Sequence, residues 1–167
     1  MPRTGSPEVV LIVEQNATVA LLLAECVTQL WPSVTVFVFD TLRAALAWLR
    51  TATPDLLVLA LTLPDIPGDA PLRGVQGVLP FLTLSTPLLV LSGQLAPLEG
   101  IQALRAGATG FLSKEEWHPE RILQMLARLW ARMQGIDARR TAIAEATSVP
   151  TDVALPFPGL LDLSDVT

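Results

Sequence analysis

The most informative stretch of the chain is PDLLVLALTLPDIPG, which spans residues 54–68. Its first part, residues 56–61, is an uninterrupted aliphatic run, and such runs are typical of strands buried on both faces of a parallel sheet. Its second part holds two prolines, an aspartate and a glycine, which predict a loop. Ala60 lies close to the end of the predicted strand, so the strand brings a methyl group to this loop instead of a polar side chain.

Runs of the same kind recur along the chain. Further strands are predicted at residues 9–13, 34–39, 88–92 and 110–113. Helical patterns alternate with them at 17–30, from a cap at Asp40 or Thr41 to about Arg50, at 97–106 and at 119–133. This alternation predicts an α/β fold in which helices cover both faces of a parallel sheet. Sites in such folds lie beyond the carboxyl ends of the strands.

The connection at residues 69–86 is the irregular part of the pattern. Pro71, Gly74, Gly77 and Pro80 all oppose a regular helix there. We therefore expect a short or distorted helix between the third and fourth strands.

The last predicted helix carries more apolar surface than packing on a sheet requires. One stripe consists of Ile122, Leu126, Leu129 and Met133, and a second of Leu123, Ala127 and Trp130. We expect the second stripe to be covered by a partner subunit or by the chain's own tail. The sequence thus divides into a domain at 7–134 and an extension at 135–167, with a possible helix at 136–146 followed by an acidic tail punctuated by apolar residues.

Composition narrows the classes of function. The 167 residues carry a net charge of −5, and no cluster of Lys and Arg is present to neutralise nucleic-acid phosphates. Cys26 is the single cysteine, so the chain can form neither an internal disulfide nor a cysteine-based metal site, which fits a reducing cytoplasm. No apolar stretch is long enough to be a membrane span.

Polar residues follow several of the predicted strands: Glu14 and Gln15 after the first, Ser92 at the end of the fourth and Lys114 after the fifth. From about Pro7 to Gln134 the chain resembles the CheY-like receiver domains of bacterial response regulators. The resemblance is carried by residues 11–14, by residues 54–68 with their Leu-Pro-Asp-x-x-Gly loop, by residues 87–92 and by residues 103–114. It implies a flavodoxin-like (βα)5 fold with strand order 2-1-3-4-5.

The resemblance also implies a role for each strand end. An acidic pair after the first strand holds Mg²⁺, an Asp at the end of the third accepts a phosphoryl group, a Ser or Thr after the fourth contacts it, and a Lys after the fifth neutralises it. An aromatic residue on the fifth strand reports the switch. Ser92, Lys114 and Phe111 match the last three of these roles.

The remaining positions depart from the family pattern. Ala60 supplies no nucleophile, Gln15 replaces one member of the acidic pair, and Glu115 stands where receivers usually have a proline. Mg²⁺ is held by carboxylate and phosphate oxygens, of which little remains here. We therefore expect a degenerate receiver with no bound metal, no cofactor and no catalytic residue.

Lys114 is the only lysine of the chain. A partly buried ammonium group needs a partner, so we expect an ion pair between Glu14 and Lys114 that closes the vacated pocket. The alternative is that Lys114 and Ser92 still bind an anion.

These features favour a phosphorylation-independent module that binds another signalling protein, or a second copy of itself as a homodimer. The expected surface is the one that the family uses, namely the fourth helix, fifth strand and fifth helix. Its candidate residues are Leu98, Gln102, Phe111, Trp117, Leu123 and Trp130. Core packing is the alternative role for Leu123 and Trp130.

Two other functions are possible in principle. The vacated pocket could sense a small ligand or an anion. An enzyme of the same fold class is disfavoured, because the sequence shows no nucleophile with a base and no phosphate-binding loop. Asp65, Asp69 and His118 are expected to be loop residues, and no direct contact with nucleic acid or membrane is expected.

Overall fold

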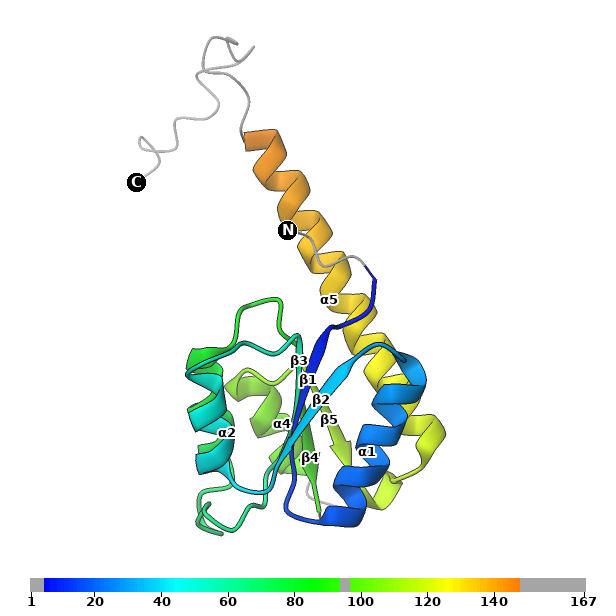
Figure 1. Ribbon diagram of the computed structural model, residues 1–167. Helices are drawn as coiled ribbons and strands as arrows, with labels where there is room; N and C mark the ends of the chain where they lie inside the picture. Colours follow the sequence, from blue (N-terminus) through cyan, green and yellow to red (C-terminus); the bar gives the residue numbers. More distant parts are fainter. Residues whose placement is uncertain (1–4, 94–96, 148–167) are drawn as a thin grey trace, which may run out of the picture.

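The computed structural model describes residues 5–93 and 97–147 and contains five parallel strands alternating with five helices (Figure 1). The strands are β1 (Val9–Val13), β2 (Thr35–Phe39), β3 (Leu56–Ala60), β4 (Leu88–Ser92) and β5 (Gly110–Ser113). The helices are α1 (Ala17–Leu30), α2 (Leu42–Leu49), α3 (Arg73–Val78), α4 (Pro97–Ala106) and α5 (Pro119–Thr147), with 3-10 turns η1 (Leu79–Phe81) and η2 (Lys114–Glu116). The strand order is β2-β1-β3-β4-β5, which confirms the predicted fold.

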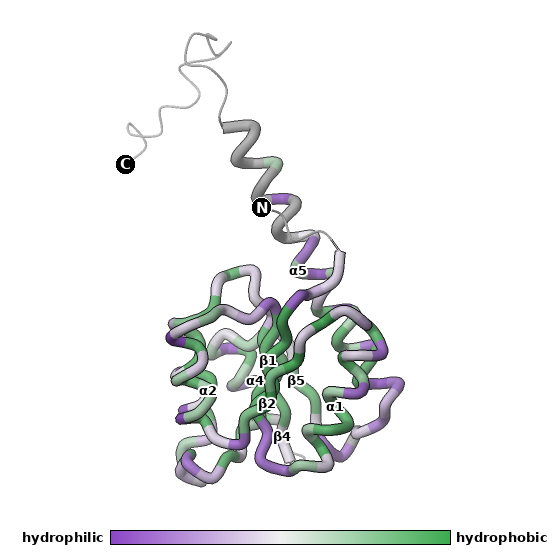
Figure 2. Tube along the Cα trace, in the orientation of Figure 1, coloured by the Kyte–Doolittle hydropathy of each residue, from purple (hydrophilic) through white to green (hydrophobic). Residues whose placement is uncertain are grey.

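The sheet is covered on both faces, as the aliphatic runs predicted. Helices α1 and α5 pack on one face, and α2, α3 and α4 on the other (Figure 1). All five residues of β3 and of β4 are buried. The strands accordingly form the apolar centre of the hydropathy trace in Figure 2. Burying one Leu or Val side chain contributes about 1.5–3 kcal/mol, so these strands are the main source of stability.

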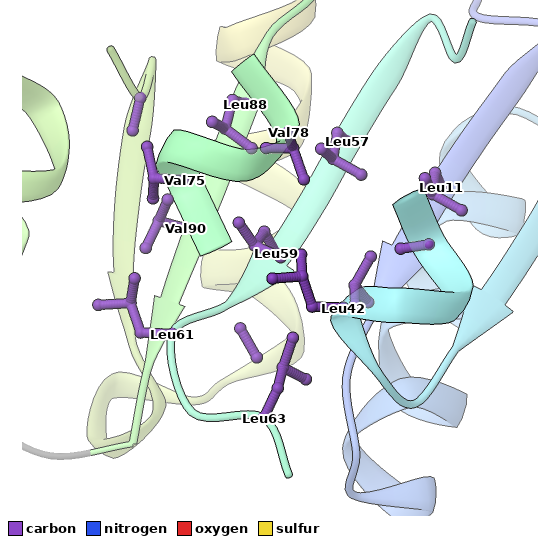
Figure 3. Close-up of a cluster of buried hydrophobic side chains, with 14 of the residues drawn as sticks. Leu11, Leu42, Leu57, Leu59, Leu61, Leu63, Val75, Val78, Leu88 and Val90 are labelled. Atoms are coloured by element: carbon purple, nitrogen blue, oxygen red, sulfur yellow. The ribbon is translucent and has the colours of Figure 1, made fainter. Parts of the chain in front are cut away.

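Figure 3 shows the cluster beneath α2 and α3. Leu57, Leu59, Leu88 and Val90 project from the strands toward Val75 and Val78 of α3, among other aliphatic side chains. The cluster extends to Ala60 and Leu61, so apolar packing continues up to the strand end where the candidate site lies.

The irregular third connection is confirmed. Helix α3 has only six residues, and η1, which contains Pro80, follows it directly. Proline lacks the amide hydrogen that an α-helix needs, so the chain tightens into a 3-10 turn at this point.

Asp65 has a structural role that the loop assignment missed. Its two carboxylate oxygens accept hydrogen bonds from the backbone amides of Leu42 (3.0 Å) and Arg43 (2.8 Å) in the first turn of α2. Desolvation acts to raise the pKa of this carboxyl. The amide hydrogen bonds, aided by the charge of Arg43, outweigh it, so the pKa lies below its ordinary value of 3.8. Asp65 therefore ties the loop after β3 to α2.

Asp65→Ala is expected to destabilise the protein by about 1 kcal/mol at neutral pH, because two amides at a helix start lose their acceptor. The folded-state pKa is depressed, so this contribution is complete above the ordinary pKa of 3.8 and is lost as the pH falls through the lower, folded-state pKa. Urea unfolding of the two proteins across this pH range should show the gap narrowing below pH 3.8. Asp69→Ala, in the same loop, is the matched control. An equal loss in that control, or a gap that persists in acid, would contradict the assignment.

Helix α5 is longer than predicted. It does not end near Met133 but continues to Thr147, so that residues 136–146 are helical as part of α5. The expected division of the chain into 7–134 and 135–167 stays a prediction. Within the parts that the structure describes, no helix combines the length and apolar character that crossing a bilayer requires.

Trp130 belongs to the core, which corrects its assignment to the interaction face. It is 5% exposed and meets Trp31 of α1 edge to face, with ring centroids 6.1 Å apart. Its Nε1 donates to the carbonyl oxygen of Gly5 (2.5 Å), to which Gln134 Nε2 also donates (2.7 Å). Trp130 is thus covered by α1 and by the segment before β1, whereas Leu123 of the same stripe is half-buried and Ala127 is exposed. The tail at 148–167, which the sequence suggested as a cover for this stripe, lies outside the described residues.

Candidate functional site

The structure brings together the strand ends that the sequence pointed to. The carboxyl ends of the strands meet at the lower edge of Figure 1. Glu14 and Ala60 directly follow the paired residues Val13 and Leu59, and Ser92 pairs with Ser113, which precedes Lys114. An open pocket of about 550 Å³ lies at this edge, lined by Gln15, Asn16, Thr62, Ser92, Gly93, Glu99 and Lys114.

The predicted ion pair lies at the centre of the site, but it does not close the pocket, which stays open. Lys114 Nζ donates to Glu14 Oε1, and the second carboxylate oxygen of Glu14 accepts from the amide of Gln15 (3.1 Å). The Glu14 side chain is fully buried and that of Lys114 is 22% exposed. Removing one member of a buried pair leaves an uncompensated charge, which costs several kcal/mol. Glu14 therefore neutralises the charge of Lys114 from within the protein, and the ammonium group of Lys114 is already engaged in a hydrogen bond.

Two of the three departures from the family pattern, Ala60 and Gln15, have clear structural settings. Ala60 is 1% exposed and its methyl group packs into the cluster under α2 and α3. Gln15 is exposed, and its Nε2 donates to the carbonyl oxygen of Thr62 (3.3 Å), which ties the loops after β1 and β3 together. Across the described ranges no three His, Cys, Asp or Glu side chains are grouped so that they could hold a metal ion.

Glu99 is a site residue that sequence reasoning missed. It lies in the first turn of α4, where a carboxylate is favoured by the helix dipole, and its Oε2 accepts from Ser92 Oγ (3.3 Å). Ser92 is itself almost fully buried. The site thus holds two carboxylates, Glu14 and Glu99, against the single ammonium of Lys114, and its formal charge is negative. The sequence signal for this role was an acidic residue in the first turn of α4, shortly after the serine that ends β4.

Glu115 makes a backbone hydrogen bond that a proline at this position could not make. Its backbone amide donates to Ser113 Oγ (3.3 Å), and this bond caps the η2 turn. Proline has no amide hydrogen, so the family's usual residue would forfeit the bond.

Phe111 contacts the backbone of α4. The ring is half-buried against the cluster under α2 and α3. A Cβ built on Gly100 would lie only 2.6 Å from Phe111 Cδ1, so only glycine permits this close approach. The positions of α4 and of the aromatic side chain on β5 are therefore coupled directly through van der Waals contact.

The other candidates for an interaction surface separate into two groups. Leu98, which is 65% exposed, and Gln102 lie on the open face of α4. Trp117 and Leu123 are half-buried and pack against the core between the sheet, α1 and α5. Two further exposed residues, Ile101 and Leu104, follow Leu98 at a spacing of three. These three side chains form an apolar stripe on α4, which we call the α4 stripe.

The fold and the strand-end site define a doubly wound α/β domain of the kind that places its chemistry at the carboxyl edge of a parallel sheet. The chain belongs to the response regulator receiver domain family, whose model matches residues 10–127.

The chain is also similar to individual proteins. The transcriptional regulatory protein KdpE of Mycobacterium tuberculosis is 37% identical over 92 residues, which are 55% of this chain and 35% of KdpE. The chain therefore spans about a third of the length of that relative. A putative response regulator from Chloroflexus aurantiacus is 25% identical with a TM-score of 0.61, covering 75% of this chain and 99% of the other. A CheY-like receiver from Methanospirillum hungatei has the same fold, with 18% identity, a TM-score of 0.63 and coverage of 78% and 98%.

Proposed function

We propose that this chain is a phosphorylation-independent receiver that acts in signalling by binding another protein. The observation that carries the proposal is the ion pair of Lys114 with the buried Glu14, beside the methyl group of Ala60. In the family this lysine neutralises an incoming phosphoryl group. Here its charge is already met by Glu14, and the position that would carry the phosphoryl has no nucleophile. The proposal assigns the chain no catalysis and no metal.

The link between the pocket and the surface supports the same function. Ser92 is engaged by Glu99, the next residue is Gly100, and Phe111 packs directly against Gly100. These contacts fix the start of α4 by groups that the chain itself supplies. The α4 surface is therefore available to a partner without any modification of the pocket.

The proposed binding surface is the open face of α4 together with β5 and the first turns of α5. The α4 stripe supplies its apolar part, while Gln102 and Arg105 are exposed on the same helix. The partner is another signalling protein or a second copy of the chain, in the cytoplasm. The sequence has a net charge of −5 and no cluster of Lys and Arg, so we propose that this chain does not itself contact nucleic acid.

Exposed residues on two helices offer a matched test of this surface. Leu98→Glu is expected to reduce binding of the captured partner, or self-association, by about ten-fold or more, because it places a charge in the apolar part of the interface. Leu21→Glu on α1 is the control, since Leu21 is 61% exposed and lies on the other layer. Affinity capture of the tagged chain and light scattering would measure both effects. Equal losses in the two variants, or binding that requires a phosphodonor, would contradict the proposal.

A second candidate function is a small-ligand sensor, favoured by the open pocket of about 550 Å³. Glu99 lines this pocket, and the charge of Lys114 is already neutralised by the buried Glu14, so the pocket suits an uncharged or cationic polar ligand better than an anion. Thermal-shift screening distinguishes the candidates, since stabilisation by a polar compound that Glu99→Gln abolishes would support the sensor.

A further inference from the structure

A second pocket lies at the other end of the sheet from the strand-end site. It encloses about 710 Å³ between the β3–β4 connection, the end of α4 and the middle of α5. Its wall is mainly apolar and includes Leu79, Leu82, Leu84, Leu104 and Met133. Leu84 is 77% exposed, which leaves a large apolar side chain uncovered at the mouth of the pocket. The exposed Arg132 of α5 supplies a positive charge at the same place.

The chain itself contains a segment that suits this pocket. Residues 148–167 lie outside the described residues, but their sequence holds three aspartates and no Lys or Arg. Its apolar residues gather at Leu155, Phe157, Leu160, Leu161 and Leu163. Pro156 and Pro158 favour an extended backbone, which lowers the entropy cost of docking.

The lengths also agree. Helix α5 passes the pocket at Arg132 and Met133 and leaves the domain at the upper edge of Figure 1. Thr147 is about 21 Å further along the helix, at 1.5 Å per residue. An extended chain covers that distance in about six or seven residues. A tail that turns back at Thr147 therefore reaches the pocket at about residue 154, where its apolar part begins.

We propose that residues 155–163 of the tail are the ligand of this pocket, with the leucines against its apolar wall and Asp162 facing Arg132. The assignment does not depend on the function of the strand-end site. It has one consequence for the α4 stripe: Leu104 belongs to both surfaces, so the docked tail covers the end of the stripe.

Disulfide trapping in the full-length chain tests the proposal. The pair Leu84→Cys and Leu161→Cys should form an intramolecular disulfide about ten-fold faster, or more, than the control pair Leu21→Cys and Leu161→Cys. The control keeps the cysteine in the tail but places the second cysteine on α1, away from the pocket. Cys26 does not compete, because it is buried and because burial, with Glu25 nearby, raises the pKa of its thiol. Equal rates overturn the proposal. A disulfide that forms only between molecules also overturns it, because the occupant is then the tail of a second copy.

A charge exchange tests the orientation of the tail. Arg132→Glu should slow trapping about three-fold or more, and adding Asp162→Arg should restore the rate, because the pair regains opposite charges. Arg128→Glu, on α5 but outside the pocket lining, is the control and should leave the rate unchanged. An equal effect of Arg128→Glu, or no rescue by Asp162→Arg, contradicts the pairing with Arg132. None of these readouts requires a binding partner, so they remain informative if the proposed function fails.

Discussion

Lys114→Met is expected to lower the free energy of unfolding by about 3 kcal/mol, because it leaves the carboxylate of Glu14 buried without its cation. Glu14 is fully buried, and the amide of Gln15 is its remaining partner among the contacts described above. The methionine retains most of the apolar stem of the lysine, so the loss reports mainly on the charge. Urea unfolding at neutral pH measures the effect directly.

The matched control is the double variant Glu14→Gln and Lys114→Met. Removing both charges should recover most of the stability that Lys114→Met loses, which gives a coupling energy of about 1–3 kcal/mol in a double-mutant cycle. Additive effects of the two single variants would show that Glu14 and Lys114 do not stabilise each other.

The fold was predictable because its strongest signals are local. The aliphatic runs at 9–13, 56–61 and 88–92 are short and typical of strands buried on both faces, and parallel strands of this kind are usually joined by helices. The end of α5 was not predictable in this way. Gly135 costs about 1 kcal/mol inside a helix, which favoured a break there, but the helix continues through it.

The interior position of Trp130 could not be obtained from periodicity. Its partners Trp31 and Gly5 come from distant parts of the chain, and a helical pattern does not show which apolar stripe faces the sheet and which faces another helix. An aromatic residue on a second stripe is compatible with an interface or with a core, and only the packing of α1 against α5 distinguishes the two.

The strand-end site was largely predictable, because parallel strands bring their carboxyl ends together whatever the loops do. That rule was enough to place Glu14, Ala60, Ser92 and Lys114 at one edge. Glu99 and Asp65 were missed because they reach their partners from a helix and a loop, whose positions are set by tertiary packing.

Ala60→Asp alone is expected not to restore phosphorylation. The new carboxylate would lie in a buried position beside Glu14 and would compete with it for Lys114. Gln15 would still supply an amide where the family has an acid, so binding of Mg²⁺ would remain weak. Glu99 would keep its hold on Ser92 and repel an incoming phosphoryl group.

Incubation of Ala60→Asp with acetyl phosphate and Mg²⁺, followed by intact-protein mass spectrometry, tests directly whether this pocket can be phosphorylated. A receiver domain that retains its acceptor aspartate, treated in parallel, shows that the donor is active. Ala60→Asp with Gln15→Asp shows how much of the defect lies in the lost acidic pair. No phosphoryl adduct is expected on the wild type or on Ala60→Asp. Efficient, Mg²⁺-dependent labelling of the single variant Ala60→Asp would show that the pocket still supports the family's chemistry. It would contradict the proposal that Gln15, Glu99 and the Glu14–Lys114 pair, together with Ala60, prevent phosphorylation.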